Sequence, residues 1–65
     1  MGKHEVYMFL KQNKKRKGWS NKEIAEQLDV SVGSVTNATK KLIYDKSIKM
    51  VSDYEESRRR YRFKI

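Results

Sequence analysis

Hydrophobic and polar positions between residues 24 and 42 follow a helical period that is broken once. Apolar residues stand at 24, 25 and 28, and again at 35, 38 and 42. Each set fits one face of a short helix. The pattern therefore predicts helices over residues 21–29 and 32–45, joined by a tight turn.

Capping signals mark the starts of both helices. Ser20 is followed three residues later by Glu23, which is the spacing of a capping box, and Trp19 and Ile24 fit the matching hydrophobic staple. Ser31 is the expected cap of the next helix. Two caps eleven residues apart predict two separate helices and not one continuous helix. In this interpretation Trp19 is a packing residue rather than a platform for base stacking.

The N-terminal segment predicts a further helix over residues 4–14, because Val6, Phe9 and Leu10 fall on one stripe. A basic run then leads from Lys14 to Gly18, a residue type that commonly ends helices. This run is either a solvated loop or a loop that contacts phosphates.

After Lys46 the period changes to two, which predicts strands over residues 47–52 and 58–65. In the second strand basic residues (Arg60, Arg62, Lys64) alternate with apolar ones (Tyr61, Phe63, Ile65). This alternation predicts an apolar face toward the core and a basic face toward solvent. The polar segment 53–57 is interpreted as the connecting turn. The expected fold class is α+β, a single domain over residues 1–65 with three helices followed by a C-terminal β-hairpin.

Composition narrows the function. The 65 residues include 16 lysines and arginines against eight acids, a formal net charge of +8, with one histidine and no cysteine. A surface this basic attracts polyanions, of which nucleic acid is the commonest inside cells. An enzyme, a metal site and a cofactor are not expected, because catalytic and ligating side chains are too few. No apolar run approaches the length of about 20 residues that spans a membrane, so an intracellular protein is expected (cytoplasmic, nucleoid-associated or, if viral, in the host cell).

The chain resembles the winged helix-turn-helix family in one segment above all, which contains Ile24, Ala25, Leu28, Val30, Ser31, Val35 and Ala38, with Leu42 beyond. The three predicted helices and the basic hairpin extend the resemblance over nearly the whole chain. Asp29 stands where that family often has glycine, but aspartate tolerates the left-handed conformation. The resemblance implies a small transcription regulator that inserts helix 32–45 in the major groove of double-stranded DNA and lays its wing on the flanking backbone or minor groove. The alternatives are a protein–protein interaction module or a replication-associated DNA-binding adaptor.

By the same resemblance, base edges are read from the first two turns of the third helix, which are Gly33, Ser34, Thr36 and Asn37. Asn37 is the best candidate for direct readout, because its amide matches N6 and N7 of adenine. The absence of arginine on this face predicts modest specificity with an A/T bias. The candidate phosphate contacts are Ser31, Lys40, Lys41, Arg58, Arg59, Arg60, Arg62 and Lys64.

Two further features leave alternatives open. The acidic tip of the wing, Asp53 to Glu56, points away from DNA, pairs internally with the arginines, or belongs to a wing that docks a protein partner. A homodimer through the outer side of the first helix, with Tyr7 and Met8 in contact, is one option for the oligomeric state, and a monomer is the other. RNA binding is a weaker third function, since Tyr44 and Tyr54 are the only plausible stacking platforms.

Overall fold

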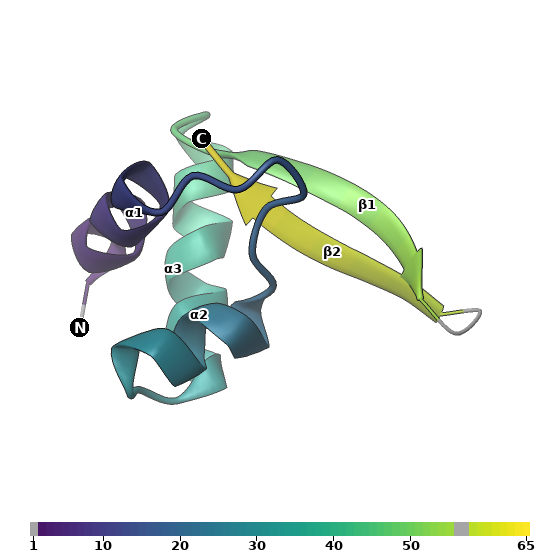
Figure 1. Cartoon of the computed structure of the whole chain (residues 1–65). Coiled ribbons are helices and arrows are strands. Elements are labelled where there is room, and N and C mark those ends of the chain that lie inside the picture. The colour runs from purple at the N-terminus through teal and green to yellow at the C-terminus, as the bar shows by residue number, and fades with distance from the viewer. Residues whose placement is uncertain (1, 56–57) are drawn as a thin grey trace.

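A computed structural model describes the backbone of residues 2–55 and 58–65 and the side chains of residues 2–52 and 60–65. Three helices precede a two-stranded antiparallel hairpin (Figure 1), with the bounds α1 Lys3–Gln12, α2 Asn21–Leu28, α3 Val32–Tyr44, β1 Lys49–Glu55 and β2 Arg58–Lys64. The α+β fold class predicted from the sequence is therefore confirmed, and the layout is consistent with that of a winged helix.

Local capping explains why α2 and α3 are separate helices. The Ser20 hydroxyl accepts a hydrogen bond from the Glu23 amide, and the Glu23 carboxylate accepts one from the Ser20 amide, which confirms the capping box. Asp29 ends α2 in the left-handed conformation with φ 55° and ψ 50°. Ser31 then caps α3 by accepting from the Ser34 amide. The chain is thereby turned sharply between two short helices.

The core lies where α1 and α2 pack against α3, closed at one end by the hairpin. Its buried apolar members are Val6, Leu10, Ile24, Ala25, Val35, Ala38, Leu42, Ile48 and Phe63. Thr39 is also buried, and its hydroxyl oxygen lies within hydrogen-bond distance of Oδ1 of Asn21 and of the carbonyl oxygen of Thr36, both at 3.0 Å. This contact links the start of α2 to the middle of α3, and the hydrophobic pattern gave no sign of it.

The first strand differs from its predicted bounds at both ends. It begins at Lys49 because Lys46 adopts a positive φ of 62° and the Ser47 amide bonds back to the carbonyl of Leu42, which closes α3. It continues to Glu55, which pairs with Arg58. Residues 53–55 are therefore strand and not turn. Pairing of backbone groups along the full length of β2 outweighs the polar character of this segment, whose side chains lie outside the described residues.

The first helix ends at Gln12, two residues before the predicted end. Asn13 ends it, because both its backbone amide and its side-chain amide donate to the carbonyl of Phe9 at 2.9 Å. Residues 13–18 then run as a loop toward the hairpin (Figure 1). The basic run 14–17 is thus released from α1 and placed beside the sheet.

Trp19 adds a short third element to the sheet. Its amide donates to the carbonyl of Phe63 at 2.8 Å and its carbonyl accepts from the Phe63 amide at 2.7 Å. The indole ring meets Phe9 edge-on, with centroids 4.9 Å apart, and its Nε1 donates to the carbonyl of Asn13. Trp19 therefore packs against the core, as predicted, and also holds β2 through its backbone.

Candidate nucleic-acid interface

The outward row of α3 is the first part of the candidate site. Val35, Ala38 and Leu42 are buried on the inner side of this helix, which turns its polar side outward. Three of the four residues predicted to read bases are exposed, namely Gly33, Ser34 and Asn37. The fourth, Thr36, is half-buried. The polar row that the sequence predicted is thus open to solvent.

Two hydroxyls of this row bond within their own helix. Oγ of Ser34 lies 2.9 Å from Oγ of Ser31, and Oγ1 of Thr36 donates to the carbonyl of Val32 at 2.8 Å. Asn37 is a longer polar side chain that combines donor and acceptor in one planar group. Asn37 is therefore the residue of this row best suited to a two-point contact with a base edge.

Positively charged side chains and the N-terminus of α3 lie beside the outward row of α3. Lys40 and Lys41 are exposed in the second half of α3, and Ser31 is exposed at its N-terminus. Lysine suits phosphate as a point charge on a flexible stem. The backbone amides at the start of a helix also favour an anion. All three predicted phosphate contacts of this region are therefore accessible.

A groove separates α3 from the hairpin. It has a volume of about 290 Å³ and is lined by Asn21, Thr36, Thr39, Lys40, Ile43, Met50, Tyr61 and Phe63. Met50 is 52% exposed and Tyr61 is 45% exposed. The alternation in the sequence predicted that Tyr61 faces the core, and this prediction was wrong, because Tyr61 is exposed. The hairpin projects beyond the helices (Figure 1), so the helices cover β2 only at its Phe63 end.

A second hollow, of about 440 Å³, adjoins the first at the start of α2. It is lined by Ser20, Asn21, Lys22, Glu23, Arg60, Tyr61 and Arg62. Lys22 and Arg60 are exposed cations. Oδ1 of the Asn21 side chain lies 3.0 Å from the hydroxyl of Thr39, so its Nδ2 is the group that can donate to an anion. Asn21 and Lys22 were not among the residues predicted for the site, although their position directly after a capping serine was a usable signal.

Arg62 departs from its predicted role. Its Nη2 lies 2.6 Å from Oε1 of Glu23 and its Nε donates to the carbonyl of Gly18 at 3.1 Å, which leaves the side chain 17% exposed. The alternation rule predicted a basic side chain directed to solvent. The loop before Trp19 and the start of α2 lie over this part of β2 instead, so Arg62 bonds within the protein.

The charge on Glu23 is stabilised by its surroundings. Partial burial acts to raise the pKa of this carboxyl, but the hydrogen bond from the Ser20 amide and the positive charges of Arg62 and Lys15 outweigh it. The pKa of Glu23 therefore lies below its ordinary value of 4.5. The ion pair ties α2 to β2, and so fixes the angle between the helices and the wing.

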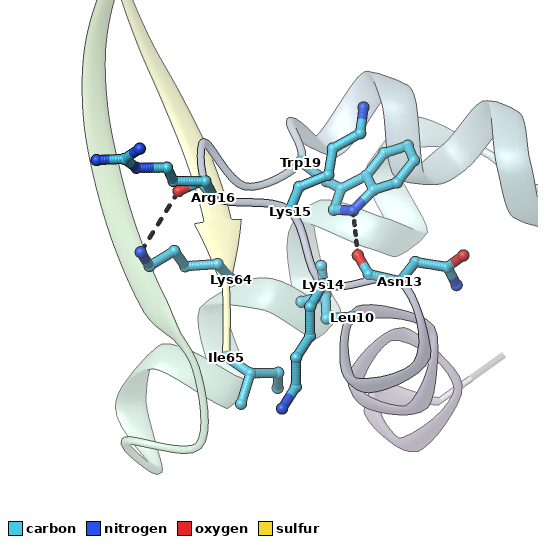
Figure 2. A pocket seen from close by; sticks show the side chains of 8 residues that line it. All are labelled: Leu10, Asn13, Lys14, Lys15, Arg16, Trp19, Lys64 and Ile65. Carbon is cyan, nitrogen blue, oxygen red and sulfur yellow. Dashed lines mark hydrogen bonds between the residues drawn. The ribbon is translucent and has the colours of Figure 1, made fainter.

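Lys64, another predicted phosphate contact, lies on the face of β2 away from the groove. Its Nζ donates to the carbonyl of Arg16 at 3.4 Å. It lines a hollow of about 180 Å³ together with Trp19 and the basic loop, shown in Figure 2. The predicted basic residues are therefore divided between two surfaces. The side chains of Arg58 and Arg59, like those of the acidic tip from Asp53 to Glu56, lie outside the described residues.

The proposed dimer contacts are less open than the sequence suggested. Tyr7 is partly buried against the core, and Met8 is half-buried. Among residues 2–55 and 58–65, no helix has the length and apolar character required to cross a membrane. The described side chains, those of residues 2–52 and 60–65, include no group of three or more histidine, cysteine or carboxylate side chains placed to hold a metal ion.

Comparisons of the chain with models of protein families, with curated proteins and with solved structures gave no match. The functional assignment consequently depends on the geometry and charge of the molecule itself.

Proposed function

We propose that the protein binds double-stranded DNA as a small transcription regulator of winged helix-turn-helix type. In this proposal α3 enters the major groove, with Asn37 on base edges and Gly33, Ser34 and Thr36 close to them. Lys40, Lys41 and Ser31 contact phosphates beside the groove, and the wing follows the flanking backbone or minor groove. The protein acts in the compartment that holds its DNA.

The observation that carries this proposal is the open polar row of α3. A helix whose inner side is fully used by the core, while its outer side offers Asn37 and two lysines to solvent, has the form required for a major groove. The hollow at the start of α2 supports it further, because Lys22 extends the positive border beyond α3. Phosphate contacts on both sides of a reading helix fix its register on a duplex.

A second candidate function is a protein-interaction module, and one observation favours it. The groove between α3 and the wing is mainly apolar, and Met50 and Tyr61 are exposed beside it. Partly exposed aromatic and methionine side chains are typical of protein interfaces. In that case an acidic partner competes for the basic surface and DNA binds without sequence preference.

Salt dependence of DNA binding tests the proposal. If five to seven phosphates are neutralised, the logarithm of the association constant falls against the logarithm of salt concentration with a slope of about −4.5 to −6. Fluorescence anisotropy with a labelled duplex between 50 and 300 mM salt, about the range where such slopes are readable, gives this value. A slope near zero rejects the proposal. Selection from random-sequence duplexes then separates the two candidates, because only a regulator enriches a site.

A further inference from the structure

The basic loop and one face of the hairpin form a second positive surface, separate from the row of α3. We call it the loop surface and define it by Lys14, Lys15, Arg16, Lys17, Lys49 and Lys64. The first four and Lys49 are exposed, and Lys64 is half-buried. These six residues make up more than a third of the 16 lysines and arginines of the chain.

Alternation along β2 separates the two surfaces. Phe63 and Tyr61 line the groove against α3. Lys64 and Arg62, one residue along, instead bond to carbonyls of the loop. Successive side chains of a strand point to opposite faces, so the loop surface faces away from α3. Lys49 belongs to it because it pairs directly with Lys64.

The four cations of the loop surface that Figure 2 draws do not converge on one point. Figure 2 shows Lys14 and Lys15 extending to opposite sides of the hollow, and Arg16 and Lys64 extending to a third side. Lys15 also lies over the ring of Trp19, with Nζ 3.9 Å from the centroid. A single phosphate or carboxylate is held by groups aimed at one place. Spread charges instead fit an extended polyanion.

The character of this surface favours nucleic acid over an acidic protein. Protein interfaces depend on a few large apolar or aromatic anchors. Of the described side chains, the exposed large hydrophobic ones are Val32, Tyr44, Met50 and Tyr61, which lie on α3 or on the hairpin outside the loop surface. Five of its six charged residues are lysines, which bind phosphate backbones without requiring fixed geometry.

From this arrangement we infer that one molecule of the protein binds two DNA segments and bridges them. The inference rests on the proposed function: α3 takes the first duplex, and the loop surface takes the phosphate backbone of a second one without sequence preference. Bridging then requires no dimer, since both surfaces belong to one chain.

Two triple variants with the same change in net charge test this inference. Lys14→Gln, Arg16→Gln and Lys17→Gln remove three charges from the loop surface and retain Lys15, which covers Trp19. The control, Lys22→Gln, Lys40→Gln and Lys41→Gln, removes three charges from the α3 side. Bridging is measured as capture of a labelled duplex by protein on beads that carry a different duplex. Single-duplex affinity is measured in parallel by anisotropy.

We expect the loop variant to lose most of the bridging while its single-duplex affinity stays within about threefold of the unmodified protein, because its α3 side is intact. The salt slope of bridging should become shallower by about 2.7. The control should lose single-duplex affinity about tenfold or more. Bridging by the loop variant at the unmodified level overturns the inference and points to a dimer.

Failure of the inference and failure of the proposed function give different results. Tight binding of one duplex with no capture of a second overturns the inference alone. Capture of poly-glutamate by the loop surface, with no capture of a second duplex, overturns it in favour of an acidic protein partner. Absence of any duplex binding overturns both.

Discussion

At the residue scale, Gly18 and Gly33 stand in opposite situations. Gly18 has a φ of +79°, and a Cβ placed on it would lie 2.8 Å from the carbonyl oxygen of Phe63. Gly33 is exposed near the start of α3, and a Cβ there meets nothing within 4 Å. The first glycine is required for the close approach of the loop to β2, whereas the second is a free position on a helix.

Alanine at each glycine should therefore shift stability in opposite directions. Gly18→Ala should destabilise the fold by about 2 kcal/mol or more, from left-handed strain and the forced shift of backbone. Gly33→Ala should stabilise it by up to about 1 kcal/mol, because alanine loses less freedom in a helix. Urea unfolding followed by circular dichroism measures both. Unchanged stability of Gly18→Ala would contradict the close approach of the loop to β2, and a loss of stability in Gly33→Ala would contradict the open space at that position.

Asn37 and Lys40 give a residue-scale test of the assigned roles. Asn37→Ala should cost about 1–3 kcal/mol at a selected site and little at unrelated sequences, since a base contact is removed. Lys40→Ala should weaken binding to all sequences alike and make the salt slope shallower by about 1. Anisotropy titrations with a selected duplex and a scrambled one compare the two. Identical behaviour of the variants would remove the distinction between base reading and phosphate contact.

At the element scale, the ion pair between Glu23 and Arg62 couples α2 to the wing and makes stability depend on pH. The pKa of Glu23 is lowered in the folded state. The stabilisation is therefore fully present above the ordinary pKa of 4.5 and is lost as the pH falls through the lowered pKa of the folded state. Glutamine at this position keeps the capping box but removes the charge.

Glu23→Gln should consequently be less stable than the unmodified protein at pH 7, and the difference should be smaller at about pH 3. Because the Glu23 side chain is 38% exposed, we expect a loss of about 1 kcal/mol or less. Thermal unfolding at both pH values measures it. A difference that persists unchanged at low pH would assign the effect to packing instead of charge.

Elements set by local chemistry were predictable from the sequence, and those set by long-range pairing were not. Ser20, Ser31 and the apolar spacing act within one helical turn, so the sequence alone located α2 and α3 closely. The bridge between Trp19 and Phe63 joins segments 44 residues apart and depends on backbone groups. The internal bonding of Arg62 follows from that bridge, which brings the loop over β2. Strand alternation alone could not show which basic residues remain free.

The same division applies to the candidate site. The outward row of α3 follows from helical period, and the structure leaves it open, as the sequence indicated. Asn21 and Lys22 were missed because their place beside Arg60 requires the hairpin to reach the start of α2. Lys64 was assigned to the DNA side from its charge, yet its strand turns it to the opposite face. The periodicity of the sequence thus predicts which face of a single helix or strand is exposed. It does not predict which helices and strands come together to form one surface.

At the scale of the whole molecule, dimensions limit how much DNA one copy can cover. The Cα atoms extend over 32 × 23 × 20 Å. At about 3.4 Å per base pair, the longest dimension spans about 9 base pairs. Half-sites of a symmetric operator lie about 34–36 Å apart, so two copies fit side by side on one face of a duplex. Neither one copy bound alone nor two copies bound side by side requires a contact between proteins through α1.

Hydroxyl-radical footprinting should therefore show protection of about 10 base pairs for each bound copy, centred on the groove that α3 enters. If the protein pairs on DNA, two such blocks should appear about one helical turn apart on the same face. Light scattering at the footprinting concentration establishes how many copies are present in free solution. A block near 20 base pairs made by a single copy would contradict the proposed docking, because a body 32 Å long cannot cover that length of straight duplex. Such a result would require the duplex to bend around the protein, so that the loop surface contacts the same DNA molecule as α3.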